Sequence, residues 1–252
     1  MGWLLTMPSL LHDAFDGLRQ FLFNSKTVIA PAMWVAEMLR KIGIDEGKIC
    51  TLRQALPGEN RERELRSLPA SQNPIRLGYC GRISPEKGIL TLVEAVKIAN
   101  RDKIQFQLKV VGPISGALDW KKKVMAELQC VNAEYAGIRG GKELGRWYNE
   151  IDLLVVPSEW QETGPLVVLE AWDLGIPVIG SRSGGIREFL ENEGMSQLLF
   201  EMNQSASLLE TLANIRNIQF PLRVKIPGFK SLAQNYAVIY QKTQETRGEM
   251  IR

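Results

Sequence analysis

The chain has 252 residues, of which 45% are hydrophobic, so it is long enough and apolar enough to bury a substantial core. Its 31 lysines and arginines against 28 aspartates and glutamates give a formal net charge of +3. This composition excludes extensive disorder, and so small a positive excess gives no general reason to expect a nucleic-acid partner.

The first 23 residues are apolar but lack a basic leading segment, and a proline and two aspartates interrupt them. They therefore predict neither a secretion signal nor a membrane anchor. The cysteines, Cys50, Cys80 and Cys130, are far apart and form no CxxC pair, so neither a disulfide framework nor a zinc site is indicated. We expect a cytoplasmic protein.

Residues 9–23 carry apolar side chains at helical spacing and predict a first helix. Burial against another protein surface is the favoured explanation of its apolar face, and association with the inner face of a membrane is the alternative. His12 lies beside Asp13 with no serine or cysteine nearby in sequence, so we interpret it as a surface residue. The apolar positions of this helix are Leu10, Leu11, Phe15, Leu18, Phe21 and Leu22.

A short strand, a helix and a second strand are predicted next, at residues 26–30, 33–42 and 48–52. The segment 58–73 is rich in arginine, glutamate, serine and proline and is interpreted as a linker.

From residue 75 onward, short apolar runs alternate with helical patterns, which indicates strand–helix repeats forming a parallel sheet. The predicted fold class is α/β, a doubly wound Rossmann-like sheet, in which ligands bind beyond the carboxyl ends of the strands. The predicted strands are residues 75–80, 106–111, 133–136, 153–156, 177–179 and 197–200. The predicted helices are residues 89–100, 118–128, 142–149, 166–174, 186–190 and 229–243.

A basic, glycine-bounded loop follows the first of these strands, with the sequence GRISPEKG from Gly81 to Gly88. Arg82 offers a planar fork of donors and Lys87 a compact charge, a combination that suits a diphosphate. The alternative is a solvated turn in which Arg82 pairs with Glu86. The loop has neither a GxGxxG pattern nor a Walker pattern, and the chain has no Asp-x-Asp pair to hold a divalent metal.

Two glutamates surround the start of the helix predicted at 166–174, which is apolar on every face and therefore expected to be buried. Glu170 needs a polar partner there, because an unpaired buried carboxylate costs several kcal/mol. The alternative to a functional site is that Glu170 pairs with a structural arginine and Glu162 is a solvated loop residue; the two glutamates together, spaced around a helix start, favour a site. Pro165 is predicted at the first helical position, with Thr163 and Gly164 at the cap. Glu162 at the same helix start would repel a bare anion, so an anion that carries hydroxyl groups fits better.

Taken together, the GRISPEKG loop, the two glutamates Glu162 and Glu170, and the segment PVIGSRSGGIRE resemble the retaining glycosyltransferases of family four, over roughly residues 25 to 200. The resemblance implies the C-terminal, nucleotide-sugar-binding half of a GT-B fold. It also implies sugar transfer from a nucleotide diphosphate donor with retention and without a metal or other cofactor. The catalytic residues that it implies are Glu162, Arg82 and Lys87. The donor-binding residues that it implies are Gly81, Ile138, Thr163, Gly164, Pro165, Leu166 and Glu170.

Within that resemblance, Arg82 and Lys87 would hold the diphosphate with backbone N–H groups of residues 164–166. Glu162 would lie against the donor sugar, and Glu170 would hold the ribose hydroxyls. The loop at residues 137–139, which carries Ile138, would face the base.

The expected domains are an N-terminal remnant and linker at 1–73, a nucleotide-sugar-binding domain at 74–218, and a helical segment at 219–252. The expected function is sugar transfer to a saccharide or lipid-linked acceptor, with no nucleic-acid partner. Because the family's acceptor domain is largely missing, the alternative is a noncatalytic donor-binding subunit or a truncated enzyme, with a partner chain supplying that domain. An epimerase or phosphorylase of the same architecture is the least favoured reading.

Overall fold

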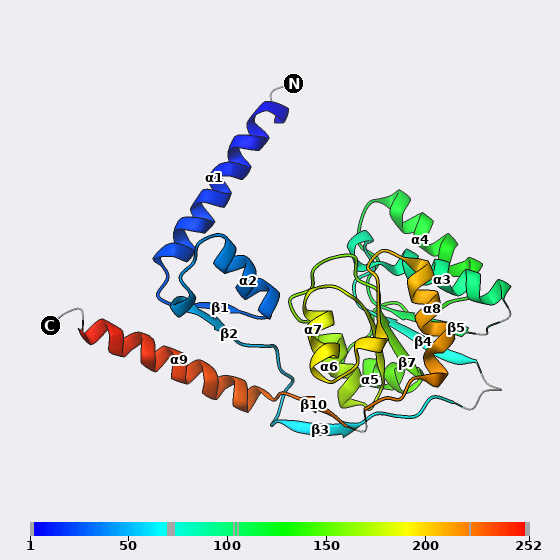
Figure 1. The fold of residues 1–252 in the computed structure, drawn as a ribbon. Helices are drawn as coiled ribbons and strands as arrows, with labels where there is room; N and C mark the ends of the chain where they lie inside the picture. The colour runs from blue at the N-terminus through cyan, green and yellow to red at the C-terminus, as the bar shows by residue number, and fades with distance from the viewer. Residues whose placement is uncertain (1–2, 70–73, 103, 105, 222, 250–252) are drawn as a thin grey trace. The chain divides into compact units, whose positions relative to one another are not determined.

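The structure is a computed structural model that describes residues 3–249, apart from 70–73, 103, 105 and 222. The side chains of residues 3–13 and 245–249 lie outside the description as well. The chain divides into two compact units (Figure 1). Unit 1 comprises Met1–Arg53 and Leu232–Arg252, and unit 2 comprises Gln54–Ser231.

Unit 2 is built on a parallel sheet of six strands in the order β6-β5-β4-β7-β8-β9. The order reverses direction between β4 and β7, as in a doubly wound fold. The central strands are buried almost throughout, as expected when helices cover both faces. The predicted α/β class is confirmed. The strands are β4 (Ile75–Cys80), β5 (Phe106–Val111), β6 (Glu134–Tyr135), β7 (Leu153–Val156), β8 (Val178–Ser181) and β9 (Leu199–Phe200).

Helices cover the two faces of this sheet (Figure 1). On one face, α3 (Ile89–Arg101) packs against α4 (Leu118–Cys130) and α8 (Ser205–Asn214). The other face carries α5 (Gly141–Asn149), α6 (Leu166–Asp173) and α7 (Gly184–Asn192). The short helices of the unit are η2 (Pro85–Lys87), η3 (Ser196–Leu198) and η4 (Ile215–Asn217).

A two-stranded antiparallel sheet joins the beginning and the end of unit 2. It pairs β3 (Arg61–Glu64) with β10 (Arg223–Ile226), with Arg61 opposite Ile226. Next to it, the N–H of Leu56 donates to the carbonyl of Pro227, and the N–H of Phe229 donates to the carbonyl of Leu56. The segment interpreted as a linker therefore contains a strand, and neither β10 nor α8 was predicted.

Unit 1 contains a two-stranded parallel sheet of β1 (Val28–Ala30) and β2 (Ile49–Thr51), connected through α2 (Met33–Lys41) and η1 (Glu46–Lys48). This strand–helix–strand order is the predicted one. The unit also contains α1 (Trp3–Asn24) and most of α9 (Phe229–Glu249). Its small core consists of Val28, Ala30, Ala36, Leu39 and Ile44.

The apolar face predicted on the first helix is largely exposed in this chain. Phe15, Leu18 and Phe21 are 55%, 55% and 69% exposed, whereas Leu22 packs against the core of unit 1. The side chains of Leu10, Leu11 and His12 lie outside the described residues. Among the residues that are described, no helix has the length and apolar character needed to cross a membrane.

Candidate functional site

A pocket of about 390 Å³ lies at the carboxyl ends of β4 and β7, the two strands between which the sheet order reverses. That position is where ligands bind in doubly wound folds. The predicted site residues that line it are Gly81, Arg82, Lys87, Glu162, Pro165 and Leu166.

The basic loop after β4 is packed tightly against the loop after β7. Gly88 closes the short helix η2 with φ of +67°, and a Cβ on it would lie 1.8 Å from the carbonyl oxygen of Pro157. The N–H of Glu159 donates to the carbonyl of Glu86 at 2.9 Å. Glycine at position 88 therefore lets the two loops touch, and this contact carries Lys87 into the pocket wall.

Lys87 and Glu162 form an ion pair in the pocket, with 2.5 Å between Nζ and Oε1. The Lys87 side chain is 29% exposed and that of Glu162 is 15% exposed. The hydroxyl of Ser158 donates to the same carboxylate oxygen at 2.7 Å. The two groups predicted to contact a diphosphate and a sugar thus contact each other in this structure.

Arg82 forms the pair expected of a solvated turn. Its side chain is 56% exposed and lies 3.3 Å from Oε1 of Glu86. A hydrogen bond that the Ser84 hydroxyl donates to Glu86 lowers the pKa of that carboxyl below its ordinary value, and the Arg82 charge adds to the effect. The buried Tyr79 hydroxyl donates to the carbonyl of Arg82 at 2.8 Å and fixes the backbone of the turn after β4.

Buried hydroxyl groups hold the loop that carries Glu162. The Ser181 hydroxyl at the end of β8 donates to the carbonyl of Ser158 at 2.7 Å, and the Ser183 hydroxyl donates to the carbonyl of Trp160 at 3.1 Å. All three serines are at most 1% exposed. The backbone of the loop is therefore fixed from the neighbouring strand.

The turn formed by Ser183, Gly184 and Gly185 lets two backbone segments pack closely together. The N–H of Gly185 donates to the carbonyl of Glu162 at 2.5 Å. A Cβ at position 185 would lie 2.7 Å from the backbone nitrogen of Gly164. The glycine lets the start of α7 touch the loop that precedes α6.

The start of α6 forms another part of the pocket wall. Pro165, predicted at the first helical position, is instead the N-cap, since its ψ of 118° is extended, and no side chain caps the helix. The helix is not buried on every face as predicted, because Leu166 is 43% exposed where it lines the pocket. The first N–H groups of a helix have no intrahelical acceptor, so the positive end of the α6 dipole lies at the pocket.

Glu170 lies one turn further along α6 and has the polar partner that its surroundings require. The Tyr148 hydroxyl donates to Oε2 of Glu170 at 2.9 Å. Tyr148 comes from α5 and is 2% exposed. The partner observed is a neutral hydroxyl, not the structural arginine of the alternative reading.

The remaining predicted residues do not line this pocket. Thr163 and Gly164 lie in the loop before α6, and Glu170 lies within α6. Ile138 is 70% exposed, on a loop held by the bond from the Gly112 N–H to the carbonyl of Gly137.

Sequence reasoning missed Tyr79, Cys80, Ser158 and Tyr148. Tyr79 and Cys80 are the last two residues of a predicted strand, and Ser158 lies two residues after another. Their places at strand ends could have identified them as candidates. Burial raises the pKa of Cys80 to about 11, which keeps it a thiol at neutral pH.

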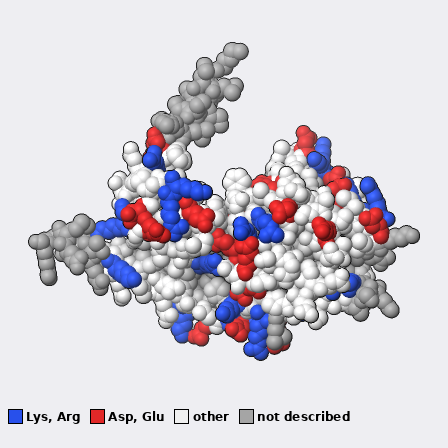
Figure 2. Space-filling view, viewed as in Figure 1, with Lys and Arg blue, Asp and Glu red and all other residues white. Residues whose placement is uncertain are grey.

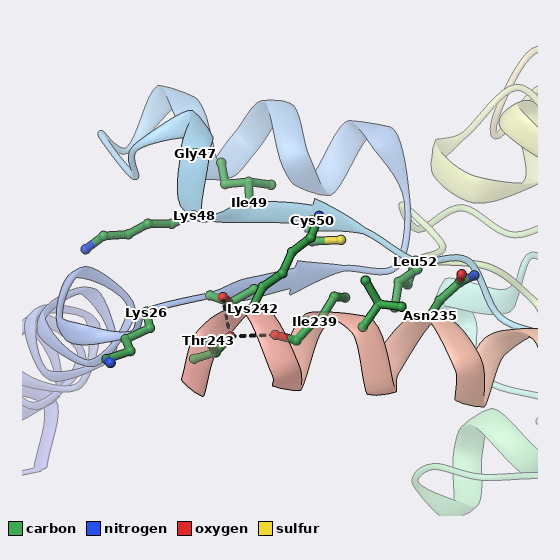
Figure 3. Close-up of a pocket in the computed structure, with 12 residues that line it drawn as sticks. Lys26, Gly47, Lys48, Ile49, Cys50, Leu52, Asn235, Ile239, Lys242 and Thr243 are labelled. Atoms are coloured by element: carbon green, nitrogen blue, oxygen red, sulfur yellow. Dashed lines mark hydrogen bonds between the residues drawn. The ribbon is translucent and has the colours of Figure 1, made fainter. Parts of the chain in front are cut away.

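A second pocket, of about 750 Å³, lies within unit 1 between β2 and α9 (Figure 3). Aliphatic side chains such as Ile49, Leu52 and Ile239 line it together with three lysines at its margins. At the pocket, the Thr27 and Thr243 hydroxyls lie 3.2 Å apart, which links the segment before β1 to α9. None of the predicted site residues lies in it.

Basic and acidic side chains are interspersed over the described part of the face shown in Figure 2. Within unit 2, Lys109 pairs with Glu134 and Glu150 at 2.9 and 2.8 Å. The described residues contain no group of three or more histidines, cysteines, aspartates or glutamates placed to hold a metal ion.

Comparison with known proteins identifies a family that this chain matches. Residues 60–226 match the family model described as glycosyl transferases group 1. The chain is 30% identical, over 216 residues, to the lipopolysaccharide 1,2-N-acetylglucosaminetransferase of Salmonella typhimurium, covering 80% of this chain and 55% of the relative. It is 29% identical, over 178 residues, to a GDP-mannose-dependent alpha-mannosyltransferase of Corynebacterium glutamicum, covering 69% and 40%.

Among solved structures, HepE of Anabaena in complex with UDP and glucose superposes with a TM-score of 0.60 at 19% identity, covering 77% of this chain and 54% of that one. That likeness is one of fold. The chain spans about half the length of the curated relatives that it matches.

Proposed function

Because the chain belongs to the group 1 glycosyl transferases, we propose that it binds a nucleoside diphosphate sugar in the pocket at the ends of β4 and β7. The proposed activity is transfer of that sugar to a saccharide or lipid-linked acceptor. One observation carries the proposal: a cation, Lys87, and the positive end of α6 converge on one pocket at the point where the sheet order reverses.

In the proposed complex, the diphosphate lies between the basic loop and the start of α6. Lys87 then exchanges its bond to Glu162 for one to a phosphate oxygen, while Arg82 reaches the diphosphate from its exposed position. Both are charge-assisted hydrogen bonds of the kind that anionic oxygens favour. The N–H groups at the start of α6 supply further donors.

The carboxylate of Glu162 becomes available to sugar hydroxyls once Lys87 turns to the phosphate. Ser158, which donates to the same carboxylate, keeps it in place. Glu170 accepts hydrogen bonds from the ribose hydroxyls deeper in the site. These roles extend the family resemblance to residues whose positions suit them.

We propose that transfer retains the configuration of the sugar and needs no resident metal. The bond between the anomeric carbon and the diphosphate oxygen breaks, and its electron pair stays with the diphosphate. The acceptor hydroxyl oxygen bonds to the same face of the anomeric carbon and gives its proton to the leaving phosphate. Lys87, Arg82 and the α6 dipole stabilise the charge that develops on the diphosphate.

Calorimetric titration with UDP, GDP and ADP tests donor binding. We expect one of the three to bind, and to bind more tightly than its monophosphate, because the second phosphate meets Lys87 and Arg82. The Lys87→Met variant should lose most of this preference for the diphosphate. Parallel titrations with magnesium and with EDTA should agree with each other.

No binding of any diphosphate by folded protein would contradict the proposal, and so would a diphosphate preference unchanged in Lys87→Met. Binding without turnover, tested with the matching nucleotide sugar and a panel of saccharide and lipid-linked acceptors, would instead favour a noncatalytic donor-binding subunit.

A further inference from the structure

Tyr148 is a buried polar group whose hydroxyl contacts two titratable side chains, Glu170 and Cys80. Its side chain is 2% exposed, and its ring contacts Trp147 edge-on with 5.3 Å between the centroids. The hydroxyl donates to Oε2 of Glu170 at 2.9 Å. Glu170, which does not line the pocket, is therefore held by a buried residue of a neighbouring helix.

The position of Tyr148 is set by the central strand of the sheet. A Cβ on Gly78, in β4, would lie 2.3 Å from Ile151 and 3.0 Å from Trp147. The glycine therefore lets the end of α5 pack directly onto β4. Since a rigid element carries the hydroxyl, its direction is fixed before any ligand arrives.

A neutral hydroxyl affects Glu170 differently from a cation. Burial raises the pKa of Tyr148 well above its ordinary value, with neighbouring Cys80 and Glu170 adding to the effect, so the hydroxyl stays protonated. A carboxylate has about four acceptor positions, and one hydroxyl uses a single one. Glu170 can therefore accept further hydrogen bonds, whereas a bidentate arginine would occupy both oxygens.

We propose that Tyr148 is a positioning residue for ribose recognition, turning the Glu170 carboxylate so that it accepts hydrogen bonds from both ribose hydroxyls of a bound nucleotide. This inference rests on the proposed function. It assigns the preference for ribose over deoxyribose to the Tyr148–Glu170 pair instead of to Glu170 alone. The expected effect of losing one such bond is about tenfold in affinity.

The test compares the nucleoside diphosphate that binds best with its 2′-deoxy analogue, by calorimetry. The wild type should prefer the ribonucleotide. Tyr148→Phe keeps the buried ring and should weaken ribonucleotide binding about tenfold. It should weaken binding of the 2′-deoxy analogue less, because that analogue keeps only the 3′-hydroxyl. Tyr135→Phe is the matched control, because it removes a hydroxyl that donates to the carbonyl of Gly112 instead; its ribose preference should equal that of the wild type.

A second variant, Glu170→Gln, tests the inference even if Tyr148→Phe alters the packing of the aromatic ring. Glu170→Gln should remove the ribose preference, and adding Tyr148→Phe to it should cause no further loss. Equal weakening of both nucleotides in Tyr148→Phe, or an unchanged preference, would overturn the positioning role alone. A wild type that binds no diphosphate would overturn the proposed function, and the positioning role with it.

Discussion

The two glutamates of the α6 region lie in opposite electrostatic surroundings. At the pocket, Glu162 is paired with the cation Lys87 at 2.5 Å, whereas Glu170, which does not line the pocket, is held by the neutral hydroxyl of Tyr148 at 2.9 Å. A carboxylate that shares a cation changes its contacts when an anion takes that cation. A carboxylate held by a hydroxyl does not. The comparison teaches that the first glutamate suits a step that depends on the ligand's charge, and the second suits recognition of a fixed group.

The largest loss of stability is expected from Gly88→Ala, which disturbs the packing of the loop that carries Glu162 and leaves the contact between Glu170 and Tyr148 in place. The added Cβ would meet the carbonyl oxygen of Pro157 at 1.8 Å, and the backbone has a φ of +67° that alanine adopts poorly. We expect a loss of roughly 3 kcal/mol in the free energy of unfolding, measured by urea titration. Gly145→Ala is the control, since a Cβ there meets nothing within 4 Å in a helix. A surface substitution usually changes stability by less than about 0.5 kcal/mol. A change that small in Gly88→Ala would contradict the described contact between the two loops.

Lys87→Met breaks the ion pair itself. It removes the cation from the Glu162 carboxylate, whose side chain is 15% exposed, while the Ser158 hydroxyl still donates to that carboxylate. We expect a loss of about 2 kcal/mol in unfolding free energy, reduced from the value for a fully buried pair because Lys87 is 29% exposed. Replacing both groups, in Lys87→Met with Glu162→Gln, should recover part of this loss. If the double variant is as unstable as the sum of the two single ones, the pair is not the cause.

A further carboxylate, Asp173 at the end of α6, sharpens the comparison, because it is paired with a cation and does not line the pocket. Arg61 donates two hydrogen bonds to Asp173, at 2.6 Å each, and these bonds lower the pKa of Asp173. A depressed pKa in the folded state stabilises the protein above the unfolded-state pKa of about 3.9, and this contribution disappears as the pH falls through the lower folded-state value.

Asp173→Asn should therefore cost about 1 kcal/mol at pH 7 and progressively less as the pH falls below about 4, in urea titrations at several pH values. Nucleotide affinity at pH 7 should stay unchanged, in contrast to Lys87→Met. If the difference in unfolding free energy between wild type and Asp173→Asn does not vary with pH, the charge of the Asp173 carboxylate does not contribute to the stability that its two bonds from Arg61 provide.

Arg82→Met should have the smallest effect on stability, below about 0.5 kcal/mol, because its pair with Glu86 joins two side chains that are 56% and 39% exposed. Its effect on diphosphate affinity should nevertheless exceed its effect on stability. Urea titration and calorimetry on the same preparation measure both. A variant with lowered stability and unchanged affinity would assign Arg82 to the turn and not to the site.

The central strands could be predicted because each is a short apolar run that ends at a turn. Strands β4, β5 and β7 have their predicted bounds. In contrast, β3 alternates arginine and glutamate and pairs with a strand about 160 positions later, where Glu64 lies opposite Arg223. No local pattern announces such a pairing. Helix α8 did carry a helical signal in Leu208, Leu209 and Leu212, which the interpretation overlooked.

The pocket residues were predictable to the extent that they follow strands directly. Arg82 and Glu162 lie in loops after β4 and β7, and parallel strands bring such loops to one edge. Tyr148 comes from the end of a helix, and its contact with Glu170 depends on how closely α5 packs on Gly78. The role of Gly185 likewise depends on a 2.7 Å approach to Gly164, which spacing along the chain does not reveal.

The backbone pairing that joins Leu56 to the segment at Pro227 and Phe229 has a consequence for protein engineering. Unit 2 starts and finishes at hydrogen-bonded neighbours, so residues 54–231 form a cassette whose two ends need only a short bridge. Adjacent ends are the geometry that tolerates transplantation into a host loop or circular permutation. New termini could then be opened at an exposed turn such as that at Gly140, with the old ends sealed across Leu56 and Gly228.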